Sequence, residues 1–161
     1  MFRPMRRARQ QLPESEAIRI LEQGSNGVLA VLGDDGYPYA VPLNYVYADG
    51  RIWVHCARAG HKLDAIRRCD RVSFCVVAED AVVPERLLTR YRSVVAFGRA
   101  RVLADAEDIR RAARRLGLKY SSDAAYIDRE IERDWAALAC VEIKIEHLTG
   151  KEALELTNER P

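Results

Sequence analysis

Hydrophobic and polar residues alternate with a period of two over much of this chain, a pattern that predicts β-strands. Turn residues separate the alternating runs, and Asp35-Gly36 and Asp49-Gly50 are strong signals for tight hairpins. Gly98 lies inside one long run and indicates a bend there. We expect strands at Gly27–Leu32, Tyr37–Tyr47, Arg51–Cys56, Arg71–Val77, Tyr91–Leu103 and Val141–Glu146.

Four segments have apolar residues at helical spacing instead. Asp105 is a suitable N-cap for one of them, and Gly117 is expected to begin its end. The stretch Ala78–Thr89 has no clear period and is expected to be a loop. The four predicted helices are Glu14–Gln23, His61–Arg68, the segment from Asp105 to Gly117, and Asp123–Arg133.

Six strands and four helices that do not alternate regularly disfavour a doubly wound parallel sheet. Antiparallel strands in one small domain must protect their edges, and closure into a barrel does so most completely. The sequence therefore predicts a mainly β, α+β fold with a six-stranded antiparallel barrel. We expect an Arg-rich N-terminal arm over 1–12, one domain over 13–150 and a flexible C-terminal tail over 151–161.

The composition and charge of the chain exclude several classes of function. The chain has 161 residues, and its 26 basic and 24 acidic side chains give a net charge of +2, which is too small for a protein held on nucleic acid by its overall field. No apolar run is long enough for a membrane span, and no secretory hydrophobic stretch follows the basic start. We expect a cytoplasmic protein that binds neither nucleic acid nor membranes. Its four cysteines form no CxxC pair and are expected to be reduced.

One predicted strand has an unusual edge. Pro38 and Pro42 have the same parity, so both remove backbone donors from the same side of the strand. That edge cannot be fully paired. Two interpretations remain open: an edge strand protected from aggregation, or an edge left free for a flat ligand.

The segment from His55 to Lys62 joins the end of a strand to the start of a helix. A helix start with Gly60 and Lys62 is suited to bind phosphate, although ordinary surface capping explains the same residues. His55, Cys56 and His61 do not indicate a metal site, because adjacent strand residues point to opposite faces and no further ligands lie nearby. No GxGxxG or Walker motif is present, so a nicotinamide donor would bind transiently or act through another protein.

Taken in order, several motifs resemble the NimA-like nitroimidazole-resistance proteins, which belong to the pyridoxamine 5′-phosphate oxidase-like flavin-binding split barrels. The resemblance extends over about residues 5–150, including Trp135. It rests on Met5-Arg6-Arg7, Gly27-Val28-Leu29-Ala30, Asp35-Gly36-Tyr37-Pro38-Tyr39, Val41-Pro42-Leu43-Asn44-Tyr45, Gly60-His61-Lys62-Leu63-Asp64, Tyr91-Arg92-Ser93-Val94-Val95-Ala96-Phe97-Gly98 and Ile143-Lys144-Ile145-Glu146-His147-Leu148-Thr149-Gly150.

This resemblance implies a homodimer of split barrels with FMN between the subunits, and exposed Tyr37, Tyr39 and Tyr45 would favour such a dimer. It implies that Lys62 faces the FMN phosphate and that His61, on the substrate side of the ring, is the catalytic residue. The residues it implies for cofactor binding are Val41, Pro42, Leu43, Asn44, His55, Cys56, Ala57, Gly60, His61, Lys62, Ser93 and Trp135.

The implied function is that of an FMN-dependent oxidoreductase in which reduced flavin passes electrons to a small acceptor, such as a nitroimidazole-type compound. A non-catalytic flavin-binding or sensing module is the alternative, and a heme-handling relative is a third option. No paired carboxylates indicate an independent acid–base site, so the expected chemistry is that of the cofactor, with no metal.

Overall fold

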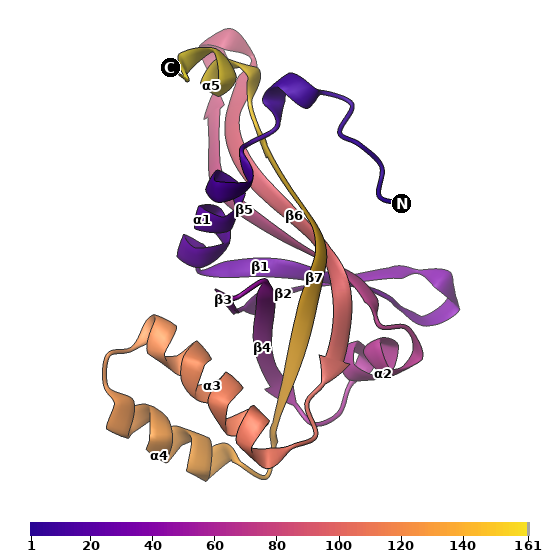
Figure 1. The fold of residues 1–161 in the computed structure, drawn as a ribbon, viewed down its shortest axis with the longest axis vertical. Helices are drawn as coiled ribbons and strands as arrows, with labels where there is room; N and C mark the ends of the chain where they lie inside the picture. Colours follow the sequence, from indigo (N-terminus) through magenta and orange to yellow (C-terminus); the bar gives the residue numbers. More distant parts are fainter. Residues whose placement is uncertain (161) are drawn as a thin grey trace.

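The computed structural model describes residues 1–160, which form one antiparallel sheet of seven strands with helices packed around it. The order across the sheet is β2-β1-β5-β6-β7-β4-β3. Figure 1 shows β5, β6 and β7 running through most of the molecule, with the two ends of the chain near the same end of these strands. The strands are β1 (Asn26–Leu32), β2 (Pro38–Asn44), β3 (Val46–Ala48), β4 (Arg51–Ala57), β5 (Arg71–Val83), β6 (Leu88–Val102) and β7 (Leu138–Glu152).

Both Asp-Gly pairs form the turns that the sequence predicts. Asp35 and Gly36 have φ of 54° and 79°, and Asp49 and Gly50 have φ of 50° and 72°. Such left-handed pairs connect strands with the right-handed twist of a sheet. They join β1 to β2 and β3 to β4, and these hairpins are confirmed.

The predicted strand Tyr37–Tyr47 is two strands, which is why the sheet has seven strands and not six. The break is at Tyr45, the one residue between β2 and β3, which are the two edges of the sheet. Tyr45 is fully buried, and its hydroxyl donates to the Leu21 carbonyl at 2.7 Å. The sheet therefore curls at this corner, but within residues 1–160 no strand pairing closes it into a barrel.

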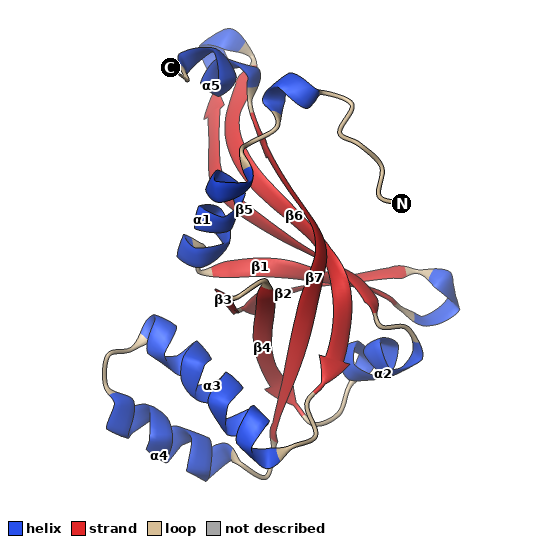
Figure 2. Cartoon of the chain, in the orientation of Figure 1, coloured by secondary structure: helices blue, strands red, loops and turns tan. Residues whose placement is uncertain are grey.

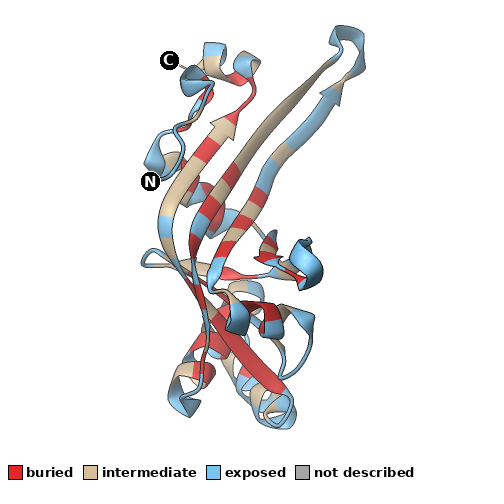
Figure 3. Cartoon of the chain, turned by 90° about the vertical axis from the view of Figure 1, so that its right-hand side faces the viewer, coloured by how far each residue is buried: buried red, intermediate tan, exposed pale blue. Residues whose placement is uncertain are grey.

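The prediction of a loop at Ala78–Thr89 is also wrong, because β5 and β6 continue as a long hairpin through this segment. A β-bulge between Val77 and Glu79 shifts the register and obscures the alternation. Leu87 takes the left-handed position in the turn that glycine or asparagine would normally signal. Figure 3 shows that the far end of this hairpin carries mainly exposed and half-buried residues.

The helices pack around the curled sheet, as Figure 2 shows. Helices α1 (Glu14–Gln23) and α2 (His61–Arg68) have the predicted bounds. Helix α3 (Ala106–Tyr120) is capped by the Asp105 carboxylate, as expected, but it does not end at Gly117. Gly117 instead lies inside the helix and packs against Ile127 of α4 (Ala124–Asp134). No helix within residues 1–160 is long and apolar enough to cross a membrane.

Two groups of buried residues make up the core. The larger one fills the curled sheet under α1 and α2, with Phe74 and Leu29 among its fully buried members. The smaller one joins α3 to the outside of β4 and β7 through Trp53 and Leu138. Gly98 of β6 lies opposite a β-bulge in β7, where the register shifts between Ile145 and His147. An added Cβ at Gly98 would meet the Lys144 carbonyl oxygen at 2.2 Å, so the close approach of β7 requires glycine at this position.

The segments outside the predicted domain are more ordered than expected. In the arm, Gln10 and Leu12 are buried, and the Leu12 amide donates to Gly150 at 2.9 Å. In the predicted flexible tail, β7 continues to the buried Glu152 and helix α5 (Leu154–Glu159) follows. Composition alone did not show that Gln10 and Glu152 bury each other, because both are usually surface residues.

Candidate functional site

Strand β2 lies at the edge of the sheet, as the two prolines predicted, and among residues 1–160 it pairs only with β1. Its side chains alternate between half-buried and exposed positions. Val41 and Leu43 pack against the main core, whereas Pro42 and Asn44 are exposed. Only the second pair can offer side chains to a ligand, so Val41 and Leu43 can contribute mainly through their backbone.

The end of β4 and the start of α2 bring several of the predicted residues together. Burial and, to a lesser extent, the positive charge of Lys62 lower the pKa of His55. Burial raises the pKa of the Cys56 thiol, and the charges of Lys62 and Arg67 oppose this shift. Lys62 is thus near both side chains, and within residues 1–160 it forms no ion pair. Ala57 is exposed at the end of the strand.

Gly60 shapes the start of α2. Its φ of 129° is one that L-residues rarely adopt, and an added Cβ would meet nothing within 4 Å. Its carbonyl accepts the Leu63 and Asp64 amides at 2.9 and 3.2 Å, which leaves the first amides of the helix without intrahelical partners. The result is an open, positively polarised helix start beside the Lys62 ammonium.

His61 is oriented by contacts with the β1–β2 turn. Its ring stacks on Tyr39 with centroids 4.2 Å apart, and its Nε2 lies 3.5 Å from Asp34 Oδ2. Asp34 also accepts from Arg68 at 2.6 Å. The side chain remains 38% exposed, so a ligand at this turn could reach it.

A cleft of about 510 Å³ opens between the sheet and the α3–α4 pair. His55 and Asn44 line it from the sheet, and apolar side chains of both helices form the opposite wall. Sequence reasoning missed the helical wall because its apolar residues were interpreted as core positions. Its members are Ala113, Leu116, Gly117, Tyr120, Ser121, Tyr126, Ile127, Glu130, Ile131 and Asp134, with Leu138 at the start of β7.

Trp135 and Ser93 do not join this group within one chain. Trp135 ends α4 and lines a separate cavity of about 430 Å³ with Arg58 and Arg67. Ser93 lies on β6 opposite Lys151, near the far end of β7 from Cys140, which pairs with His55. Within residues 1–160, no three His, Cys, Asp or Glu side chains are grouped as a metal site.

These features define an α+β protein with one curled antiparallel sheet, an open cleft against α3 and α4, and a basic helix start at α2. The chain belongs to the pyridoxamine 5′-phosphate oxidase family, whose model matches residues 13–152. The family resemblance carried by the sequence motifs is thereby confirmed. A search of curated proteins finds no match to this chain.

Solved structures support the fold. A protein of Bacteroides thetaiotaomicron assigned to 5-nitroimidazole antibiotic resistance is 18% identical, with 88% of this chain and 86% of that chain covered and a TM-score of 0.74. An FAD-binding protein of Mesorhizobium loti is 26% identical over 89% and 96% of the two chains, with a TM-score of 0.63. A flavocytochrome of Azotobacter vinelandii is 17% identical over 98% and 78%, with a TM-score of 0.77.

Proposed function

We propose that this protein binds FMN and passes electrons from the reduced flavin to a small acceptor, such as a nitroimidazole-type compound. The observation that carries the proposal is that His55 lines the largely apolar cleft and that its pKa is lowered by burial and by the charge of Lys62, so the field of the basic helix start reaches the cleft. Two structural relatives, the FAD-binding protein and the flavocytochrome, support the same ligand class.

The residues present fit such a cofactor. A volume of about 510 Å³ is within the range of small-molecule sites, roughly 300–1,000 Å³. The exposed edge at Pro42 and Asn44 offers unpaired backbone groups to a flat ring. The open backbone at Gly60 and the unpaired Lys62 suit a phosphate.

When bound, FMN supplies electron or hydride transfer, and the chain would bind and orient the reactants. Burial keeps His55 neutral to a lower pH than usual, so its imidazole can accept or donate one hydrogen bond inside the cleft. With a ring bound, the apolar wall at Leu116 and Ile127 would exclude water from the same space. In this proposal His61 acts from the turn side, held by Tyr39 and Asp34.

FMN binding can be tested with Lys62→Ala. This change should weaken FMN much more than riboflavin, because only FMN has the phosphate whose charge-assisted contact would be lost. Lys144→Ala, which removes an exposed lysine on β7, is the matched control and should change neither affinity. Equal losses for both flavins would exclude Lys62 from the phosphate site, and extraction of FAD from the purified protein would contradict FMN as the cofactor.

Turnover requires its own test, because a non-catalytic flavin-binding or sensing module remains the alternative. The absorption spectrum of the purified protein should be followed after NADH or NADPH addition, with and without a nitroimidazole. His61→Ala should retain FMN and melting temperature but slow the reoxidation of chemically reduced flavin by the acceptor. An unchanged rate with every acceptor would remove His61 from the reaction, and no reoxidation by any acceptor in the parent protein would favour the module.

We also propose that two chains associate through the outer face of the sheet. A row of directly opposed residues crosses five strands on this face: Pro42, Val28, Cys75, Val95 and Thr149. Val28 and Val77 on this face are 38% and 61% exposed, which is unusual for adjacent strands in a monomer. The argument from exposed tyrosines is weaker, because Tyr45 is buried and Tyr39 packs on the core.

Sedimentation should give about twice the 18.3 kDa of one chain. Val28→Glu should shift the protein toward monomer, because it places a charge on the apolar face that association would bury. A monodisperse monomer that still binds flavin tightly would exclude the dimer while leaving FMN binding intact.

A further inference from the structure

The Arg-rich arm is not used by the proposed flavin site, yet it forms a pocket of its own. A pocket of about 470 Å³ is lined by Met5, Arg6, Arg7 and Lys151. We propose that this pocket binds a diphosphate-bearing small molecule, separately from the cleft beside Lys62. The inference does not depend on flavin binding.

The charges in this pocket are not neutralised by the chain. Most arginines in the body of the protein pair with a carboxylate, as Arg99 does with Asp70 at 3.0 Å. Within residues 1–160, no carboxylate lies within ion-pair distance of Arg6, Arg7 or Lys151. Three neighbouring cations without an acid repel one another, so an anion bound among them is stabilised by all three.

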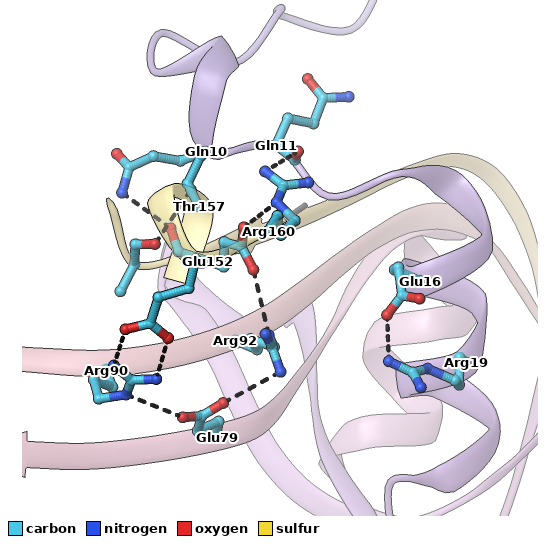
Figure 4. A network of polar contacts seen from close by, with 12 residues as sticks. Gln10, Gln11, Glu16, Arg19, Glu79, Arg90, Arg92, Glu152, Thr157 and Arg160 are labelled. Carbon is cyan, nitrogen blue, oxygen red and sulfur yellow. Dashed lines mark hydrogen bonds and ion pairs between the residues drawn. The ribbon is translucent and has the colours of Figure 1, made fainter. Parts of the chain in front are cut away.

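Buried contacts hold the arm in place beside β7. The Gln10 side chain donates to the Glu152 carbonyl at 2.9 Å, and Gln11 forms a β-bridge with Lys151. Figure 4 shows Gln10 against Glu152, and the Arg160 guanidinium beside the Gln11 carbonyl. Arg7 Nη1 in turn lies 3.4 Å from Gln10 Oε1. The Arg7 guanidinium is thus positioned before any ligand arrives, which reduces the entropy lost on binding.

The Lys151 side chain is also oriented by a contact with an aromatic ring. Its ammonium lies over the Tyr91 ring, 5.0 Å from the centroid. Ser93 is directly opposite Lys151 in the sheet, so its side chain emerges on the same face. Ser93 is also directly opposite Val77, so the pocket borders the face through which we propose that two chains associate.

The charge and the size of the pocket indicate the ligand class. Three cations match the charge of a diphosphate better than that of one phosphate ester, and arginine can bind such oxygens in pairs. The volume suits a small molecule rather than a polymer. The pocket is distinct from the cleft, because Lys151 and Cys140, the strand partner of His55, are near opposite ends of β7.

The proposal can be tested by calorimetry, with inorganic pyrophosphate and ADP as the probes. The full-length protein is used, and FMN is added to saturation if the protein binds it. Both probes should bind the parent protein. Arg6→Gln with Arg7→Gln should weaken each by at least about tenfold, since one charge-assisted contact corresponds to roughly that factor. Lys151→Gln should weaken them by about tenfold.

Two controls distinguish binding in this pocket from binding elsewhere on the protein. Arg3→Gln with Arg9→Gln removes the same charge from the arm outside the pocket and should leave both affinities within about twofold. Lys62→Ala should also have no effect. The proposal would be overturned if the parent protein bound neither probe, if the Arg3→Gln, Arg9→Gln variant lost as much affinity as the Arg6→Gln, Arg7→Gln variant, or if Lys62→Ala abolished binding. It would also be overturned if a single-stranded oligonucleotide bound more tightly and depended equally on Arg3 and Arg9.

Discussion

The two ends of β7 are stabilised by different means. Near Leu138 the strand is covered by α3, and the contacts are apolar: Trp53, Ile109 and Leu116 are all buried there. Near Glu152 the strand is covered by the N-terminal arm and α5, and a fully buried carboxylate lies between Arg92 and Arg160. The first end leaves an open cleft, whereas the second holds two chain termini against the sheet.

The difference follows from geometry and charge. The Glu152 Oε1–Arg160 Nε distance is 2.6 Å, but the N–H does not point along this contact, so the pair is electrostatic without a well-formed hydrogen bond. Arg92 contacts the other oxygen at 3.3 Å and also lies 3.6 Å from Glu79. Figure 4 shows this chain of alternating charges crossing from β5 to α5. Such a cluster fixes the position of segments that have little apolar surface to bury.

The largest expected effect is at the polar end. Glu152→Gln removes a buried charge that two arginines share, and it should lower the free energy of unfolding by about 3 kcal/mol. We expect this lower limit of the range for a broken buried ion pair because both arginines are partly exposed. Urea denaturation measures this change. Glu146→Gln breaks an exposed pair with Arg99 and should cost less than about 1 kcal/mol. Similar losses from both changes would show that burial does not increase the contribution of the Glu152 ion pairs to the free energy of unfolding.

This contrast also explains what the sequence could predict. Helices α1 and α2 and the two Asp-Gly hairpins depend on local residues, so periodicity and turn chemistry were sufficient. The buried Glu152 depends on Gln10 and Arg92, which are 142 and 60 residues away in the chain, and no local pattern records such partners. The cleft was missed for a related reason. Leu116 and Ile127 have the spacing of core residues, and only the packing of α3 and α4 leaves space beside them.

A steric change probes the apolar end. In Gly117→Ala the new Cβ would lie 2.7 Å from Ile127 Cγ2, so α4 must move away from α3. We expect a loss of about 1 kcal/mol, because overpacking outweighs the gain in helix propensity, which is roughly 1 kcal/mol. Thermal denaturation of Gly117→Ala, Ile127→Ala and the double variant tests the cause. Additive losses would indicate that the two side chains do not interact.

A smaller effect is expected where the cleft meets the sheet corner. The Tyr120 hydroxyl lies 3.2 Å from the Tyr45 amide nitrogen and 2.9 Å from its carbonyl oxygen, where the chain passes between the two sheet edges. Tyr120→Phe should cost about 1 kcal/mol, typical of one hydrogen bond in a partly exposed position. Tyr126→Phe, with a half-exposed ring in the same cleft, is the control and should leave the urea midpoint unchanged. A stable Tyr120→Phe variant would show that packing alone forms the corner.

The smallest effect concerns the pH response of the cleft. Burial and the Lys62 charge lower the pKa of His55 in the folded protein, so below the unfolded value of about 6.5 the unfolded chain binds a proton that the folded chain does not. His55 therefore lowers stability as pH falls from about 6.5 toward its folded pKa. Lys62→Ala should raise the His55 pKa in an NMR titration, but only in part because burial is the larger cause. Lys144→Ala is the control and should leave the His55 pKa unchanged. If Lys62→Ala also left the His55 pKa unchanged, Lys62 would not act on the cleft, and the proposed link between the basic helix start and the cleft would be excluded.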